Sequence, residues 1–458
     1  MKLHLSVHAA VVLLIAIPAF AQSGEGIVSR NASAPTTHPA SVFPPSAASR
    51  YKDSLEGATC EDLIRRALSS NGELAAARLD IERARARLRQ SQLRPNPTIE
   101  FEQTTGNLTG SKGERETSIG FSLPLEISGQ RKSRIDLARA ELEAIEAEIA
   151  DRERRLAFEV RAAFAEAIAL IRDLEITEGI NNLDSQTARI VEARVTEGES
   201  APIELNLLRA ETDRLKSRRA LIEGRLQSAM LRLKTLAGIA PDEPLRVKED
   251  LVSPLSFSHP ASLEAAIDIA LRARPDLRFA RLAEKLAEAG LELARAQARP
   301  DLTAFTKYSS VRSTFDDTPV GVLRDRDKLL TFGVSIQIPL FNRNQGAKAE
   351  AQAAIAQARH RREFTEQLIR AEVAGAFARF QAAQSAIDTF EQGVLARSSQ
   401  NVRSIRGAYE LGAYRMTELL AEQRRLFDSE REYTEALTER YKALADLLSA
   451  IGKGAKEE

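Results

Sequence analysis

The sequence is poor in the residues that support disulfide-rich, metal-storing or nucleic-acid-binding proteins. Its 458 residues include one Cys, three Met, five His and no Trp. A single Cys excludes a disulfide framework, and so few Cys, Met and His argue against storage of soft metals. The 65 basic and 65 acidic residues balance, whereas nucleic-acid-binding proteins usually carry a basic excess. We therefore expect no nucleic-acid partner.

Residues 1–21 have the features of a secretory signal peptide. Lys2 precedes a mostly apolar stretch over residues 7–17, and Pro18–Ala21 offers the small-x-small pattern of a cleavage site. No Cys stands at the expected cut before Gln22, so lipidation is not expected there. No later stretch is long and apolar enough for a membrane helix. The sequence predicts an exported protein without a transmembrane helix.

The composition of the rest of the chain is typical of long packed helices. Proline residues divide this part of the chain into segments. Residues 22–59 are rich in Pro, Ser and Ala and are predicted to form a linker. Two long windows, 125–201 and 340–458, contain no Pro, which a helix interior tolerates poorly. In the first window apolar residues recur at mostly three- and four-residue spacing. Residues 129–195 are therefore predicted to be one coiled-coil-like helix, about 100 Å long at 1.5 Å per residue.

The second half of the sequence repeats the first. Matching residues keep the same order along the chain at offsets that drift from 203 to 214, as in Val160 with Val373 and Gly198 with Gly412. We expect each half to have a helix, two strands, a helix of about 67 residues, a Gly-containing turn and a helix of about 37 residues. The predicted segments are a first repeat at 60–240, an inter-repeat linker at 241–261, a second repeat at 262–452 and a tail at 453–458.

Short segments of alternating apolar and polar residues precede the long helix in each half. They are residues 98–102, 118–125, 302–311 and 332–340. Such alternation places the apolar residues of a strand on one face. The pattern fits a water-exposed hairpin packed on helices as well as it fits membrane strands. Since membrane barrels start near eight strands, membrane strands would require several chains to share one barrel. The candidates for a lipid-facing side are Ile119, Phe121, Leu123, Val334 and Ile336.

Three motifs resemble those of a known family. They are Leu-Arg-Pro-Asn-Pro at 93–97, Ile-Pro-Leu-Phe-Asn-Arg-Asn-Gln-Gly at 338–346, and Tyr-Glu-Leu-Gly at 409–412 followed by Glu-Leu-Leu at 418–420. With these, the chain resembles the TolC-type outer membrane efflux proteins over about residues 60–452. The second motif is most similar to the heavy-metal (cobalt-zinc-cadmium) subgroup.

The resemblance implies a mainly α fold with a small β part, built from the tandem repeat described above. It implies a homotrimer with a twelve-stranded β-barrel in the outer membrane of a Gram-negative bacterium, continued by an α-helical barrel in the periplasm. The implied partners are outer membrane lipid, a periplasmic adaptor (membrane fusion protein) and an inner membrane pump of the resistance-nodulation-division class. The implied function is passive passage of exported solutes, expected to be metal cations.

The resemblance also implies where functional residues lie. Family members close the tunnel with carboxylates at the start of the last helix; Glu418 matches the first of these positions, and the second is Ala421 with Glu422 beside it. The pore-lining or gate candidates are Glu418, Glu422 and Tyr409. The turns at Gly198 and Gly412 are predicted as structural reversals, and the resemblance implies that they meet the adaptor. The candidates for this contact are Gly198, Leu411, Gly412, Tyr414 and Arg415.

Other classes of function fit less well. The same fold could serve protein secretion instead of solute efflux, and sequence separates these two poorly. A periplasmic coiled-coil scaffold is a second alternative, although an adaptor would need one hairpin between lipoyl-like and β-barrel modules. Catalytic, cofactor-binding and metal-binding motifs are not found in the sequence, so we expect neither an enzyme nor a bound cofactor or metal.

Overall fold

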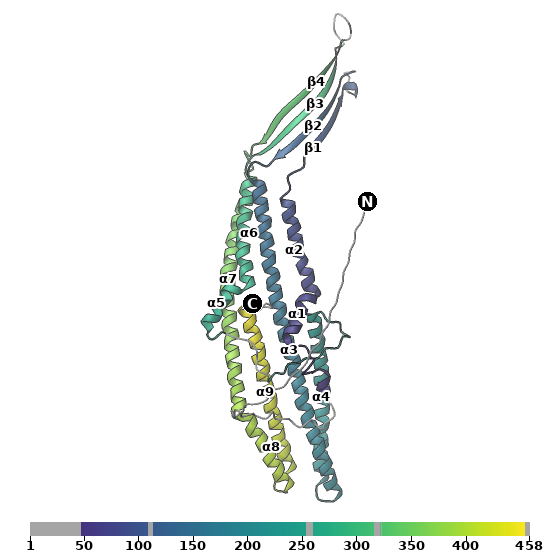
Figure 1. Ribbon diagram of the computed structural model, residues 1–458, viewed down its shortest axis with the longest axis vertical. Coiled ribbons are helices and arrows are strands. Elements are labelled where there is room, and N and C mark those ends of the chain that lie inside the picture. Colours follow the sequence, from purple (N-terminus) through teal and green to yellow (C-terminus); the bar gives the residue numbers. More distant parts are fainter. Residues whose placement is uncertain (1–46, 109–112, 253–259, 316–320, 322, 454–458) are drawn as a thin grey trace, which may run out of the picture. The chain divides into compact units, whose positions relative to one another are not determined.

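The computed structural model describes residues 47–108, 113–252, 260–315, 321 and 323–453. The predicted signal peptide lies outside these residues, as do residues 22–46 and 253–259 of the two predicted linkers and most of the tail. The first half contains α1 (Cys60–Ser70), α2 (Gly72–Ser91), β1 (Thr98–Thr105), β2 (Arg115–Leu125), α3 (Gln130–Thr196) and α4 (Pro202–Ala237) (Figure 1). The second half contains α5 (Leu263–Ala273), α6 (Pro275–Gln297), β3 (Asp301–Phe315), β4 (Leu323–Gln337), α7 (Gln345–Thr389), α8 (Leu395–Glu410) and α9 (Met416–Ala450).

The long helix of the first half is confirmed. Helix α3 is a single helix of 67 residues, one residue displaced from the predicted range. The corresponding helix of the second half is interrupted, which the sequence did not predict. Helix α7 ends at Thr389, and a five-residue π-helical turn, Phe390–Val394, joins it to α8.

In each half, an equivalent contact joins the link between the first two helices to the end of the last helix. Asn71, between α1 and α2, donates from Nδ2 to the carbonyl of Leu236 near the end of α4 at 3.1 Å. Arg274, between α5 and α6, donates from Nη1 to the carbonyl of Ala450 at the end of α9 at 3.3 Å. Each side chain satisfies a carbonyl that the end of a helix leaves without an intrahelical partner. The repeated element order and these contacts support the predicted duplication, whose boundaries remain predictions.

The four strands form one antiparallel sheet in the order β1-β2-β3-β4. Among the described residues, β1 and β4 therefore each pair with one strand only. The predicted end of the last strand at Leu340 is wrong, because β4 ends at Gln337. Pro339 has no N–H to donate to a neighbouring strand and restricts the backbone of Ile338 before it. In the other direction β4 begins nine residues before the predicted start, at Leu323.

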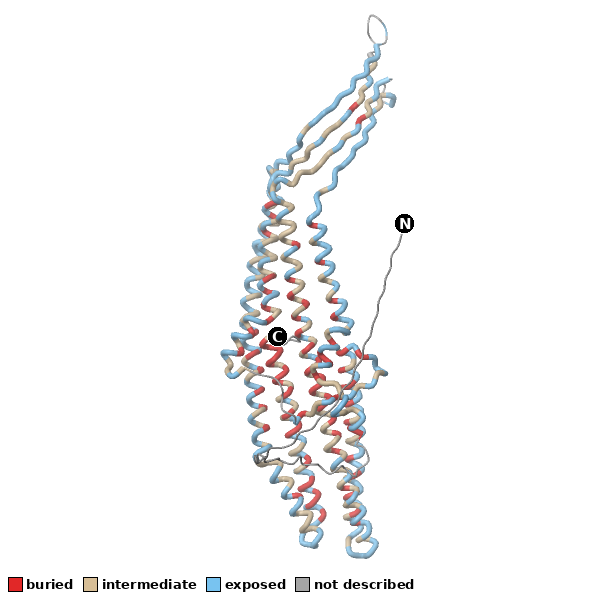
Figure 2. The backbone as a smooth tube through the Cα atoms, viewed as in Figure 1, coloured by how far each residue is buried: buried red, intermediate tan, exposed pale blue. Residues whose placement is uncertain are grey.

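The main apolar core lies where α1, α3, α4 and α9 meet. Phe164 of α3 is fully buried there, with its ring centroid 6.2 Å from that of Tyr441 in α9. Many buried α3 residues in this cluster are Ala, and small side chains let neighbouring helices approach closely. Figure 2 shows buried residues concentrated along the helices, whereas the outer strands β1 and β4 are mostly exposed and β2 and β3 are mostly intermediate. No helix within the described ranges is long and apolar enough to cross a bilayer.

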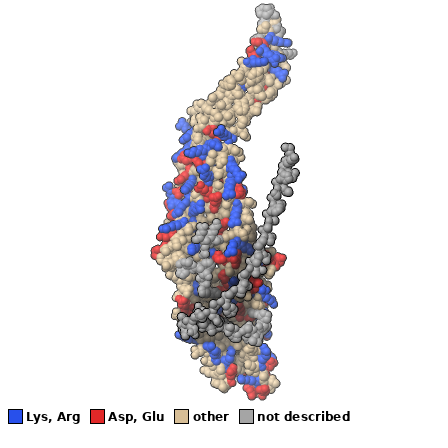
Figure 3. All heavy atoms as spheres, viewed as in Figure 1, with Lys and Arg blue, Asp and Glu red and all other residues tan. Residues whose placement is uncertain are grey.

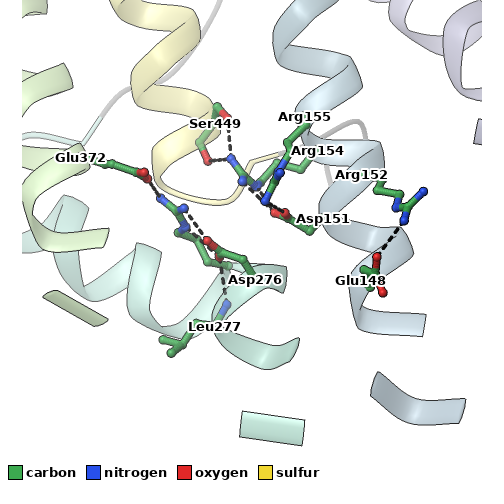
Figure 4. Close-up of polar contacts among 10 residues, drawn as sticks. Glu148, Asp151, Arg152, Arg154, Arg155, Asp276, Leu277, Glu372 and Ser449 are labelled. Carbon is green, nitrogen blue, oxygen red and sulfur yellow. Dashed lines mark hydrogen bonds and ion pairs between the residues drawn. The ribbon is translucent and has the colours of Figure 1, made fainter. Parts of the chain in front are cut away.

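A buried polar cluster fixes α3 to the end of α9 (Figure 4). Arg154 of α3 donates to Oγ of Ser449 at 2.6 Å and to its carbonyl at 3.0 Å. Its guanidinium also pairs with Asp151 at 2.7 Å, and Arg155 binds the second oxygen of that carboxylate at 2.7 Å. On the exposed side of α3, Arg152 pairs with Glu148 at 2.8 Å. The buried cluster thus joins the first half of the chain to the second.

Candidate functional site

Each half of the chain reverses direction between two helices, at residues 197–201 and 411–415, which we call the paired turns. Gly198 has a φ of +80° and Gly412 a φ of +75°. Gly adopts this left-handed conformation without a Cβ clash. Both glycines therefore have the structural role predicted for them, and both are exposed.

An apolar cluster beside the paired turns holds the α3–α4 hairpin against the α8–α9 hairpin. Val191 of α3 and Leu205 and Leu208 of α4 are buried together with Met416 and Leu419 of α9. These residues come from both halves of the chain. The two turns are therefore held as a pair by removal of apolar surface from water.

A hydrogen bond beside the paired turns links the two hairpins. The hydroxyl of Tyr409 in α8 donates to Oε2 of Glu204 in α4 at 3.2 Å. Burial raises the pKa of Tyr409 to about 12, and the neighbouring Glu204 carboxylate contributes to this rise. The hydroxyl therefore keeps its proton at neutral pH. The structure thus places Tyr409, a predicted gate residue, between the two hairpins.

Glu204 and Glu418 occupy matching positions, each the third residue of its helix, but have different partners. Oε2 of Glu418 accepts a hydrogen bond from the backbone N–H of Arg415 at 2.9 Å. This bond caps the start of α9, and the Glu418 side chain is exposed. The structure therefore places the predicted pore-lining carboxylate on the surface at the start of α9.

Glu422, the second predicted pore carboxylate, is only 5% exposed. Its Oε1 accepts a hydrogen bond from Nδ2 of Asn401 in α8 at 3.1 Å, and its Oε2 pairs with Arg425 at 2.7 Å. Within one chain, Glu422 therefore connects α9 to α8. It does not share the exposed surface on which Glu418 lies.

The residues predicted to contact the adaptor are accessible. Leu411 is 87% exposed and Tyr414 is 48% exposed. Arg415 and the two turn glycines are exposed as well. All five predicted positions at the paired turns thus lie on the exposed surface of the chain.

The other candidate region is one face of the sheet, which we call the apolar sheet face. Residues opposite one another in antiparallel strands share a face, and the strand register aligns its members across all four strands: Ile99, Phe101, Ile119, Phe121, Leu123, Leu125, Leu302, Ala304, Tyr308, Leu330, Phe332, Val334 and Ile336. Much of this surface is open to solvent, since Phe121 is 43% and Phe332 is 75% exposed. All five predicted lipid-facing residues lie on it.

The opposite face of the sheet is polar or small at most positions. It carries Glu102, whose carboxylate pairs with Nζ of Lys307 at 2.7 Å, and Ser118, Gly120 and Ser122 at alternate positions of β2. Figure 3 shows an uncharged band over the sheet, with charged residues at its loop end. An exposed apolar face backed by a polar one is the arrangement of strands that separate lipid from water.

The side chains near these regions do not suggest a metal centre. Across the described residues, no group of three or more His, Cys, Asp or Glu side chains could hold a metal ion. Cys60 is buried, and burial raises its pKa to about 12, which disfavours the thiolate that binds soft metals.

The structure adds residues that none of the three sequence motifs indicated. Glu204 could have been found from the repeat, because Glu204 and Glu418 keep the same offset as the two turn glycines. Asn401 had no such signal. Asp184 of α3 had none either; it is only 2% exposed and lines a cavity of about 110 Å³ between α3, α4 and α9.

Comparison with known proteins identifies relatives over most of the chain. The cobalt-zinc-cadmium resistance protein CzcC of Cupriavidus metallidurans is 24% identical over 410 residues, which cover 86% of this chain and 90% of that protein. The cation efflux system protein CusC of Escherichia coli K12 is 26% identical over 403 residues, covering 86% of each. A crystal structure of CusC superposes with a TM-score of 0.73 at 25% identity and covers 91% of this chain and 99% of that one.

The fold is shared more widely. The outer membrane protein VceC of Vibrio cholerae superposes with a TM-score of 0.71 at 20% identity, covering 87% of this chain and 97% of that one. The family model described as outer membrane efflux protein matches residues 63–239 and 266–453. These two ranges contain the repeated helices and strands and make up most of the sequence. The chain belongs to the outer membrane efflux protein family.

Proposed function

We propose that this protein is the outer membrane channel of a tripartite pump that exports metal cations. As a family member it lies in the outer membrane with its helices in the periplasm. The names of two relatives support cations as the solute, since CzcC is a cobalt-zinc-cadmium resistance protein and CusC a cation efflux system protein. The observation that carries the channel assignment is the apolar sheet face, which is exposed across four strands.

In this proposal three copies assemble, each contributing four strands to a closed twelve-stranded barrel. Because β1 and β4 each pair with one strand, each has one edge to which a strand of a neighbouring copy could pair. Lipid requires that such edges be paired. The apolar sheet face would meet lipid, with Ile119, Phe121, Leu123, Val334 and Ile336 outward. The polar face would then line the water-filled interior.

The paired turns would form the periplasmic end. Three copies of Glu418 around the trimer axis would make a ring of carboxylates, which favours cations. The bond from Tyr409 to Glu204 would keep the end narrow, and Glu422 would reach the pore only after α8 moves. The adaptor would dock at Gly198, Leu411, Gly412, Tyr414 and Arg415, and through it the channel would receive solute from an inner membrane pump of the resistance-nodulation-division class.

The test is the conductance of detergent-extracted protein in a planar bilayer. We expect a small conductance that prefers cations, with the preference reduced in Glu418→Gln. Glu292→Gln is the matched control, because Glu292 is an exposed carboxylate on α6 paired with Arg295, away from the turns. An unchanged preference in Glu418→Gln would remove this residue from the pore. A soluble monomer that never inserts would contradict the channel and favour the periplasmic scaffold.

The solute is tested separately in cells. A Gram-negative strain lacking this gene should become sensitive to divalent metal salts and recover on complementation. Unchanged metal tolerance together with loss of a secreted protein would favour the secretion alternative.

A further inference from the structure

Toward the loop end of the sheet, the apolar sheet face continues into a group of basic residues. The strand register places five of them on this same face: Arg115, Arg312, Arg324, Arg326 and Lys328. We call these five residues the basic rim. All of them are exposed, and Figure 3 shows blue Lys and Arg side chains at this end of the sheet. Along the strands, the face therefore changes from apolar to basic.

The two faces of the sheet carry charges of opposite sign at this end. Residues 324–328 of β4 read Arg-Asp-Arg-Asp-Lys, so alternation places the basic residues on the rim and Asp325 and Asp327 on the opposite face. Glu116 of β2 lies opposite Val311, which pairs with Asp327, and so shares the acidic face. Within the four described strands, no Asp or Glu lies on the face of the basic rim. A surface that needs only solubility intersperses both signs, so this separation indicates different surroundings on the two faces.

Three arginines of the basic rim form a row across neighbouring strands. Arg115 of β2 lies opposite Arg312 of β3, and Arg312 lies opposite Arg326 of β4. Like charges directly opposite one another destabilise a sheet. On the other face, Lys307 is paired with Glu102 at 2.7 Å, whereas no ion pair in the part of the chain that the structure describes includes a residue of the basic rim. An anion bound between the three guanidinium groups would offset their repulsion.

The distance from the apolar residues places the basic rim at the level of lipid headgroups. Arg312 follows Tyr308 of the apolar sheet face by four residues, which is about 14 Å along the strand and about 10 Å in height at a tilt of about 45°. Tyr is typical of the boundary between hydrocarbon and headgroups. With Tyr308 at this boundary, the long Arg side chains reach the headgroup layer, which is about 5–8 Å thick.

The connections of the strands identify the leaflet. Strand β1 follows α2 and β2 leads into α3, while β3 follows α6 and β4 leads into α7. The end of each strand away from the basic rim therefore joins a helix. Because the helices lie in the periplasm, the basic rim faces the outer leaflet of the outer membrane.

We propose that the basic rim binds the phosphate groups of outer-leaflet lipid. A guanidinium group matches two phosphate oxygens with parallel hydrogen bonds and remains charged at any physiological pH. The acyl chains of the same lipid would cover Tyr308 and Leu330 on the apolar sheet face. Lipid bound in this way would hold the barrel at a fixed depth. The proposal rests on the function proposed above, because lipid reaches the basic rim only when this face is outward.

Binding of a phosphorylated lipid to the detergent-extracted protein tests the proposal. The probe is fluorescently labelled lipid A with two phosphate groups. The variant combines Arg115→Gln, Arg312→Gln and Arg326→Gln, and we expect it to bind about a hundredfold more weakly, at about fivefold for each basic residue. Lys307→Gln is the matched control on the opposite face and should bind as the unchanged protein does. Equal affinities of the triple variant and the control would overturn the proposal.

Two further measurements use the unchanged protein and cover the case in which the triple variant does not assemble. Lipid A without phosphate groups should bind at least about tenfold more weakly; equal binding would show that the acyl chains alone hold the lipid and would overturn the proposal. Inorganic phosphate alone should not displace the bound lipid, because it has no acyl chains to cover the apolar sheet face. Its displacement of the lipid would indicate a site for free anions and would also overturn the proposal.

Conductance separates this proposal from the channel function. The triple variant should conduct with unchanged cation preference, because the basic rim lies outside the pore. Phosphate-dependent lipid binding by a protein that never conducts would contradict the channel and leave the lipid site in place. Normal conductance by a protein that binds lipid A equally with and without phosphate groups would contradict the lipid site and leave the channel function in place.

Discussion

The hydroxyl of Tyr409 lies 3.2 Å from Oε2 of Glu204 and joins the hairpin of one repeat to the hairpin of the other. Tyr409→Phe removes this bond, which is worth about 1 kcal/mol. We expect roughly a fivefold increase in the open probability of the channel in a planar bilayer. Tyr414→Phe is the control, because Tyr414 lies exposed in the second turn. A Tyr409→Phe channel that opens no more often than the control would show that the bond does not restrain opening.

Gly412→Val should impair efflux more than membrane insertion. The left-handed φ of Gly412 strains a residue with a Cβ by about 1–2 kcal/mol, and a β-branched residue is especially disfavoured there. Gly407→Val is the matched control, since Gly407 lies within α8 and nothing crowds the added Cβ at either position. The measurements are solute export by cells and the amount of protein in outer membranes. Equal loss of both would limit Gly412 to a structural role.

Phe121→Arg should reduce the amount of assembled protein in the outer membrane. A charged side chain on a lipid-facing strand costs about 2–4 kcal/mol near the middle of the bilayer. Ser122→Arg tests the adjacent residue on the polar face and should be tolerated better. The measurement is the yield of trimer extracted from outer membranes. Equal yields for Phe121→Arg and the unchanged protein would contradict lipid contact at the apolar sheet face.

Arg154→Ala should destabilise the protein by about 3 kcal/mol, because it leaves the buried Asp151 without one of its two partners. Arg152→Ala removes an exposed pair two residues away and should cost about 0.5 kcal/mol or less. Thermal unfolding in detergent measures both. Similar shifts of the midpoint would mean that the buried cluster contributes no more than a surface ion pair.

Asp184 should make stability depend on pH. Burial, with a smaller contribution from Glu211, raises the pKa of Asp184 to about 6, although Arg406 and Gln423 oppose the rise. The native state then holds a proton that the unfolded state releases near pH 4, so stability falls as pH increases from about 4 to 6. The loss approaches about 3 kcal/mol and is constant above pH 6.

Asp184→Asn should remove this pH dependence and raise the unfolding temperature at pH 7. Asp213→Asn is the control, since Asp213 is an exposed carboxylate on α4 paired with Lys216. Unfolding curves recorded at several pH values provide the comparison. A pH profile of Asp184→Asn that follows the unchanged protein would contradict the assignment.

Patterns that repeat locally predicted much of the fold. The absence of Pro and the spacing of apolar residues predicted α3 to within one residue, and alternation identified residues of the apolar sheet face. The predicted strand end at Leu340 was wrong because the alternation of apolar and polar residues continues to that position, whereas the pairing of β4 with β3 does not. The π-helical turn was missed because no Pro marks residues 390–394, so the Pro-free window gives no sign of an interruption there.

The site was less predictable than the fold. Gly198 and Gly412 were identifiable because a helix reversal requires a particular backbone conformation. The bond from Tyr409 to Glu204 and the burial of Glu422 depend on how separate hairpins pack, which spacing within one segment does not encode.

The sheet has an even number of strands, and this parity has a consequence for assembly. Directions alternate from β1 to β4, so the two outer strands run oppositely. Copies related by rotation about an axis can therefore meet β4 to β1 with the alternation unbroken, and a ring of any number of copies closes without a parallel pair. A chain with three or five strands would place two parallel strands at every junction. Duplication of a two-stranded unit guarantees the even count.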